Sequence, residues 1–281
     1  MVDLRTESSV IREFLAEFLG TFILTTLGCC VNAASAVSKH GAISGMTGPW
    51  GWGLALTASI YVSGGVSGGH VNPAVTLGMA AIGKLSWLKV PHYFAAQYIG
   101  AFFGAMATYF VYIEAITSNF GVDLQTEGAN ATASIFGTFP QSEVSVGTCF
   151  LDQVICVSLF LLIIQAITDE RNMGCPKGLI PIAIGIADLS LMIFAFGFNC
   201  GAPINPARDF GPRLFSSLVG YGGEVFSLRG YNYFWLPLVA PHIGGIIGSW
   251  IYVICISLHW PAQNFDVESE EQSEKFINRS Q

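Results

Sequence analysis

The chain has very little charge for its length. Only 11% of its 281 residues are Asp, Glu, Lys or Arg, whereas soluble domains carry about 25%. Thirteen of the 31 charged residues fall at the two ends, 1–17 and 260–281, so the 242 residues between them hold 18. A water-soluble fold cannot cover its surface with so few charges. This excludes a soluble enzyme, a nucleic-acid-binding protein and a disordered chain.

Cysteine shows no pattern of a disulfide framework, although the chain contains seven. Five lie within apolar runs, where we interpret them as small buried side chains: Cys29, Cys30, Cys156, Cys200 and Cys255. The sequence also lacks a nucleophile–histidine–acid set, a cluster of metal-ligand residues and a phosphate-binding loop. It therefore predicts no enzyme and no catalytic residues, metal or cofactor.

What the chain has in abundance is apolar sequence, which makes up 52% of its residues. A helix needs about 20 predominantly apolar residues to cross a bilayer. Six stretches with at most one charged residue reach that length: 18–38, 40–83, 90–113, 147–168, 178–198 and 230–259. The second is long enough for one crossing helix and a further short apolar piece. These lengths predict an all-α protein that crosses the lipid bilayer six times.

Basic residues in the short loops indicate the orientation of the spans, because cytoplasmic loops are rich in Lys and Arg. They follow the second and fourth stretches: Lys84, Lys89, Arg171 and Lys177. The long connection 114–146 has no Lys or Arg, so we expect it to be extracellular. Both tails, 1–12 and the acidic 261–281, are then cytoplasmic. In the extracellular connection, Asn130 stands in an Asn-Ala-Thr sequon and is predicted as a glycosylation site.

The two halves of the chain repeat one pattern, with repeat one at about 13–113 and repeat two at about 147–260. The tripeptide Asn-Pro-Ala occurs once in each: Asn72-Pro73-Ala74 and Asn205-Pro206-Ala207. An acid lies upstream of each copy, Glu17 at 55 residues and Asp152 at 53 residues before the asparagine. Because three spans per half is an odd number, the second half enters the membrane from the opposite side. The pattern predicts an inverted repeat.

The short apolar pieces that start at the two tripeptides, 72–82 and 205–217, cannot cross a bilayer alone. Each has a proline at its first helical position, where a missing N–H costs nothing. Two half-helices that enter from opposite faces would meet near the midplane. Irregular backbone is tolerated there only inside protein or along a water-filled path. The arrangement therefore predicts a pore.

The residues around the two prolines have the chemistry of a pore wall. We expect Asn72 and Asn205 to cap the half-helices and to point amide N–H groups into the lumen. Two positive helix N-termini at one point would repel cations and interrupt a proton-conducting chain. Extended loops before the caps would present carbonyl oxygens: Gly68, Gly69, His70, Gly201 and Pro203. Glu17 and Asp152 need partners inside a membrane, and we expect them to hold these loops in place.

Arg208 follows the second tripeptide directly. Its five N–H donors suit a hydroxylated solute, and its charge excludes cations. Together with the tripeptides, the motif at 16–21 (Ala-Glu-Phe-x-Gly-Thr) and the run 67–76 (Ser-Gly-Gly-His-Val-Asn-Pro-Ala-Val-Thr) resemble the aquaporin family. The resemblance covers about residues 10–260.

The run 205–213 resembles the aquaglyceroporin branch of that family, whose marker acid and base match Asp209 and Arg213. The resemblance implies the aquaporin fold, with six transmembrane helices and two re-entrant half-helices. It also implies a homotetramer in the plasma membrane with one pore in each protomer. Such a pore would pass water, glycerol and similar small neutral solutes, urea and small polyols among them, and would exclude protons and ions.

The resemblance places a selectivity filter at four positions: Trp52, Ile193, Ala202 and Arg208. Trp52 would offer the carbon face of glycerol an apolar wall while Arg208 binds its hydroxyls. Ala202 stands where a second aromatic ring often occurs, so the filter should be wider. Ile193 departs from the family, in which water channels have His and glycerol channels usually Gly, and leaves the diameter open. Asp188 in the fifth span has no role in the family pattern.

Other interpretations stand beside a passive channel. A secondary transporter would also have inverted repeats, but it usually carries ion-coupling acids where this chain has two asparagines. A junctional membrane protein that has lost permeation would not need Trp52, Arg208 and both tripeptides intact. A water-selective or narrow pore, caused by Ile193, is the remaining alternative. We predict a passive channel for water and glycerol.

Overall fold

A computed structural model describes residues 5–38 and 47–261. Within these ranges the chain has no β-strand, only an isolated bridge between Gln125 and Ala131. Its longer elements are α1 (Ser9–Val37), α2 (Thr47–Ser67), α3 (Pro73–Ala81), α4 (Val90–Phe120), α5 (Val146–Thr168), α6 (Ile180–Ser190), α7 (Gly197–Cys200), α8 (Pro206–Ser216), α9 (Glu224–Tyr231) and α10 (Leu236–Cys255). The expected all-α class is confirmed. Residues 1–4 and 262–281 of the expected tails lie outside the described residues.

The lengths of the helices match the thickness of a bilayer. Within residues 5–38 and 47–261, four helical stretches are long and apolar enough to cross it: Ser9–Val37, Trp87–Phe120, Val146–Thr168 and Leu236–His259. The 21 residues of α2 extend about 31 Å at 1.5 Å per residue. The fifth expected span is not one helix, because α6 ends at Ser190 and a π-helical turn, Leu191–Ala195, separates it from α7.

Glycines bring the long helices close together in the same way in both halves. A Cβ atom on Gly100 of α4 would lie 2.5 Å from the carbonyl oxygen of Phe18 in α1. In the second half, a Cβ on Gly248 of α10 would lie 2.0 Å from the carbonyl oxygen of Ser158 in α5. Small residues allow such close approach where lipid gives helices no hydrophobic reason to associate. The contacts of α1 with α4 and of α5 with α10 therefore correspond across the repeat.

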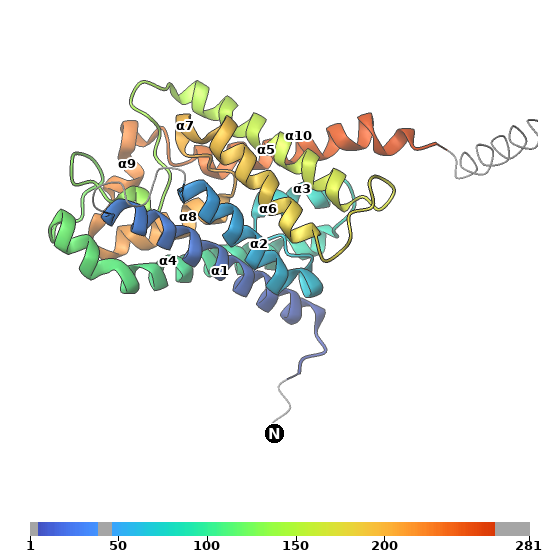
Figure 1. Cartoon of the computed structure of the whole chain (residues 1–281), viewed down its shortest axis with the longest axis horizontal. Helices are drawn as coiled ribbons and strands as arrows, with labels where there is room; N and C mark the ends of the chain where they lie inside the picture. The colour runs from blue at the N-terminus through green and yellow to red at the C-terminus, as the bar shows by residue number, and fades with distance from the viewer. Residues whose placement is uncertain (1–4, 39–46, 262–281) are drawn as a thin grey trace, which may run out of the picture.

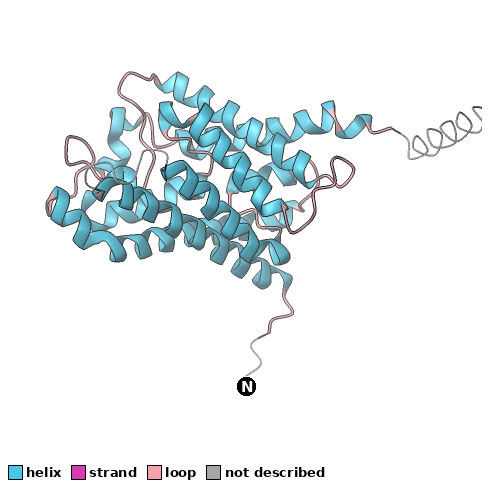
Figure 2. Ribbon diagram, viewed as in Figure 1, coloured by secondary structure: helices cyan, strands magenta, loops and turns pink. Residues whose placement is uncertain are grey.

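The connections described next lie at the two ends of the helix bundle (Figures 1 and 2). The start of α1, the end of α10, and the loops that carry Lys84 and Arg171 lie at one end (Figure 1). The connection between α4 and α5 lies at the opposite end. The basic loops and the acidic connection are thus on opposite sides of the bundle, as the charge pattern predicts.

Candidate functional site

The first half-helix, α3, begins in the middle of the molecule at Asn72, whose backbone is extended. Its side-chain oxygen accepts a hydrogen bond of 2.8 Å from the N–H of Ala74, which is the N-cap expected from the sequence. Its amide nitrogen donates to the carbonyl oxygen of Ile204, 3.0 Å away in the loop of the other half. Pro73 is the first helical residue.

The second half-helix, α8, begins in the corresponding way at Asn205. Its side-chain oxygen accepts from the N–H groups of Ala207 and Arg208, both at 3.1 Å. Its amide nitrogen donates to the carbonyl oxygen of Val71 at 2.8 Å. Pro206 is again the first helical residue. Each asparagine thus ties its own half-helix to the loop before the other one, so the two N-termini meet.

Glu17 holds the first loop through four hydrogen bonds. Its carboxylate accepts from the backbone N–H groups of His70 at 2.9 Å and Val71 at 2.7 Å. It also accepts from the Ser67 hydroxyl at 2.5 Å and the Gln97 amide at 2.7 Å. The side chain is fully buried, and these donors replace the water that a carboxylate needs. The loop keeps a left-handed backbone at Val71, with φ of 44°.

Asp152 does not brace the second loop in the same way. Among the described residues its carboxylate accepts one hydrogen bond, of 2.6 Å, from the side chain of Asn199 in α7. Its other oxygen has no partner. The backbone N–H groups of Gly201 and Ala202 make no bond to it in this part of the chain. Asp152 is thus tied through Asn199 to α7, the helix that precedes the second loop.

Two cavities lie along the axis of the bundle, one of about 410 Å³ on the side of the basic loops and one of about 540 Å³ on the other side. We call them the inner cavity and the outer cavity. The inner cavity is lined by Asn72 and Asn205 and by three residues of the expected carbonyl loop: Gly68, Gly69 and His70. Of the second loop, Ala202 and Ile204 line the inner cavity and Gly201 the outer one. Pro203 is buried and lines neither.

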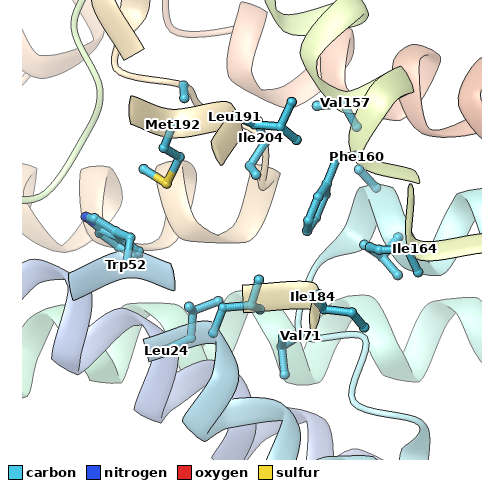
Figure 3. Packing of buried hydrophobic residues seen from close by; sticks show 14 of the residues in the cluster. Leu24, Trp52, Val71, Val157, Phe160, Ile164, Ile184, Leu191, Met192 and Ile204 are labelled. Atoms are coloured by element: carbon cyan, nitrogen blue, oxygen red, sulfur yellow. The ribbon is translucent and has the colours of Figure 1, made fainter. Parts of the chain in front are cut away.

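Of the side chains that the structure describes, three line both cavities: Trp52, Met192 and Arg208. They define the constriction between the cavities. Trp52 and Met192 lie close together in Figure 3, with α5 residues such as Phe160 on the facing wall. The Arg208 guanidinium carbon lies 4.1 Å from the centre of the Trp52 ring, a cation–π contact.

Hydrogen bonds orient two side chains of this constriction, the Trp52 indole and the Arg208 guanidinium. The Trp52 indole N–H donates to the Asn32 side-chain oxygen at 3.1 Å, and the Asn32 amide donates to the carbonyl oxygen of Ile135 at 3.2 Å. A guanidinium nitrogen of Arg208 donates to the carbonyl oxygen of Phe136 at 3.3 Å. The connection between α4 and α5 therefore orients both side chains. No motif marks Asn32, which stands in a long apolar run.

Met192 precedes Ile193, the residue that the sequence predicts in the filter, and lines both cavities. The side chain of Ile193 lies outside the described part of the chain, so its place in the filter stays a prediction. Both residues belong to the π-helical turn, in which the N–H of Phe196 donates to the carbonyl oxygen of Leu191, five residues back, at 2.9 Å. Such a turn holds one residue more than an α-helical turn.

The expected branch-marker pair, Asp209 and Arg213, lies beside the pore and not in its wall. The Arg213 guanidinium donates to the Asp209 carboxylate at 2.9 Å, and both side chains are fully buried. Asp209 also accepts from the backbone and hydroxyl of Thr138 at 2.8 and 2.6 Å. The pair thus fastens the connection between α4 and α5 to α8. Asn130 is exposed in that connection.

Comparisons with known proteins agree with this geometry. Residues 4–252 match the family model described as Major intrinsic protein. The chain is 45% identical over 271 residues to Aquaporin-9 of Homo sapiens, covering 96% of this chain and 90% of that protein. It is 42% identical over 263 residues to Aquaporin-10 of Homo sapiens, covering 93% and 86%. The X-ray structure of the aquaglyceroporin from Plasmodium falciparum superposes with a TM-score of 0.78 at 34% identity, covering 88% of this chain and 97% of that one.

Proposed function

The chain belongs to the major intrinsic protein family, and on this premise we propose how its pore selects among solutes. The protein is a passive transmembrane channel for water and glycerol. The proposed selection among solutes rests on one observation, the constriction where the inner and outer cavities meet. It is formed by Trp52, Met192 and Arg208.

Glycerol passes this constriction with its carbon atoms against one wall and its hydroxyl groups against another. Its carbon face lies along the indole ring of Trp52, and its hydroxyl oxygens accept from the N–H groups of Arg208 that the protein leaves unused. Ala202 lines the inner cavity with only a methyl group, so it leaves room beside the ring. Urea and small polyols fit the same description, since they are small, neutral and rich in hydrogen-bonding groups.

Ions and protons are excluded at two places. The N-termini of α3 and α8 meet at Asn72 and Asn205, and each helix end carries about half a positive charge. Each asparagine amide has a second N–H that can donate to a water molecule in the inner cavity. Water there must present its oxygen, so a chain of donating waters is interrupted. Arg208 adds a full positive charge at the constriction.

The proposed assembly is a homotetramer in the plasma membrane, with one pore in each channel domain of residues 13–260. Both termini are cytoplasmic and residues 114–146 are extracellular, with glycosylation at Asn130. The shared position of the basic loops, the start of α1 and the end of α10 supports this orientation (Figure 1). The family is a channel family, and we assign the chain no enzymatic activity.

Stopped-flow measurements on proteoliposomes test the proposal. A glycerol gradient reports glycerol permeability, and a sorbitol gradient reports water permeability in the same preparation. We expect the protein to raise both above the values for empty liposomes. The variant Ala202→Phe should lower glycerol permeability more than water permeability, because a ring would enter the inner cavity. Water flux without glycerol flux in the parent protein would overturn the proposal and identify the constriction as too narrow.

A further inference from the structure

The wall of the inner cavity contains an acid, Asp188, whose carboxylate has no hydrogen-bond or ion-pair partner among the described residues. Asp188 lies in the last turn of α6 and is 4% exposed. It lines the inner cavity together with Ile180 and Ile184, which stand eight and four residues before it in the same helix. Side chains at this spacing share one face of a helix. The face of α6 toward the pore is therefore apolar except for one carboxylate.

The other buried acids of the described residues have partners within the protein. The partners are Lys89 and His92 for Glu13, four hydrogen-bond donors for Glu17, Asn199 for Asp152 and Arg213 for Asp209. Among the described residues, no such bond reaches Asp188. An ionisable group inside a membrane protein is costly, and one without a structural partner points to a function in the solute path.

Arg208 is the cationic group whose charge acts on Asp188. Both side chains line the inner cavity, yet they form no ion pair, so their charged atoms are more than 4.0 Å apart. Arg208 offers only donors, whereas a carboxylate offers acceptors. The space between them belongs to a cavity of about 410 Å³, which exceeds the roughly 30 Å³ that a water molecule occupies in the liquid. A solute with several hydroxyl groups can therefore bridge the two.

We propose that Asp188 and Arg208 form a solute-binding subsite in the pore, in which Asp188 accepts a hydrogen bond from one hydroxyl of a polyol while Arg208 donates to another. Asp188 then favours polyols over water, because a polyol meets the two groups with two separate hydroxyls, whereas a single water molecule has one oxygen. This proposal rests on glycerol permeation through the same pore, and it assigns a specificity-determining residue to α6.

Two substitutions separate hydrogen bonding from packing. Asp188→Leu removes both acceptor oxygens at similar volume, and Asp188→Asn keeps one oxygen but removes the charge. The matched control is Ser190→Ala, which removes a polar group from α6 where it lines neither cavity. All variants are reconstituted at equal protein content, and glycerol flux is measured over a series of glycerol concentrations beside water flux in a sorbitol gradient.

We expect Asp188→Leu to raise the half-saturating glycerol concentration by about tenfold, equivalent to about 1.4 kcal/mol of lost binding. Water permeability should change much less. Asp188→Asn should give an intermediate rise, and Ser190→Ala none. If Asp188→Leu does not fold, the half-saturating glycerol concentration of Asp188→Asn alone tests the proposal. The subsite would be overturned if the folded Asp188 variants kept the half-saturating glycerol concentration of the parent and its ratio of glycerol to water permeability. An equal loss of glycerol flux and water flux would also overturn it. A parent protein that passes no glycerol would instead overturn the proposed function.

Discussion

At the scale of single residues, the constriction depends on Asn32, a side chain in the wall of the outer cavity. Asn32 accepts from the Trp52 indole N–H and donates to the Ile135 carbonyl oxygen. Trp52 in turn lies beneath the Arg208 guanidinium. The hydrogen bond from the indole N–H to the Asn32 side-chain oxygen therefore sets the orientation of the Trp52 ring. Asn32 is thus a positioning residue.

Replacing Asn32 with Leu should release the Trp52 ring. The substitution leaves a buried N–H and a buried carbonyl oxygen without partners, and an unsatisfied buried group costs about 1–3 kcal/mol. Part of that cost can be relieved by rotation of the indole into the pore. We expect the glycerol-to-water permeability ratio to fall several-fold in the stopped-flow assay. Asn32→Asp keeps the acceptor for Trp52 and should retain most of the parent ratio. If the two variants behave alike, Asn32 does not act through Trp52.

Residues fixed by a short motif could be predicted from the sequence. Asn72, Asn205 and Arg208 stand at or beside the two tripeptides, and the chemistry of a helix N-terminus leaves little choice about their placement. Asn32 and Ile204 could not be found in this way. Their roles come from tertiary contacts across more than 100 residues of chain, and nothing in their immediate sequence marks them.

At the scale of elements, the π turn after α6 carries one of the side chains that form the constriction. Met192 lines both cavities and lies in the turn Leu191–Ala195, which holds one residue more than regular helix. Inserted residues of this kind change the side-chain register without changing the apolar character of the segment. Hydrophobic pattern alone therefore cannot reveal them.

Truncating Met192 should widen the constriction, because its side chain lines both cavities. We expect Met192→Ala to raise the permeability of a four-carbon polyol relative to glycerol by several-fold in proteoliposomes. The neighbouring variant, Ile193→Ala, removes a similar apolar volume and tests the filter position that the sequence predicts. An unchanged permeability ratio in Met192→Ala would contradict the place of Met192 in the constriction.

The contact between α5 and α10 gives a prediction about stability. A Cβ atom on Gly248 would lie 2.0 Å from the carbonyl oxygen of Ser158, which is backbone and cannot rotate away. The helices must separate to accept Gly248→Ala, at a cost of about 1–3 kcal/mol, as for overpacked cores. We expect a lower unfolding temperature in detergent by tryptophan fluorescence. Gly65→Ala in α2 is the control, because no atom lies within 4 Å of the added carbon. Equal melting of both variants would contradict this contact.

At the scale of the whole molecule, the inverted repeat and the distribution of charge point to one orientation in the membrane. The basic loops after α3 and α5, the start of α1 and the end of α10 lie at one end of the bundle. The connection between α4 and α5 carries Glu and Asp without Lys or Arg and lies at the other end. Because Lys and Arg are retained on the cytoplasmic side, this connection should be extracellular. The sequence alone predicts this arrangement, since the number of spans fixes which loops share a side.

The orientation can be tested through the two sequons of the chain, which lie on opposite sides in the proposed topology. Asn130 is exposed in the connection between α4 and α5, where glycosyltransferases can reach it. Asn278 stands in the proposed cytoplasmic tail. In a eukaryotic expression host we expect a mobility shift on gels that glycosidase treatment removes. Asn130→Gln should abolish that shift, whereas Asn278→Gln should leave it unchanged. If Asn278→Gln abolished the shift, the tail would be extracellular, and the charge pattern would have given the wrong orientation.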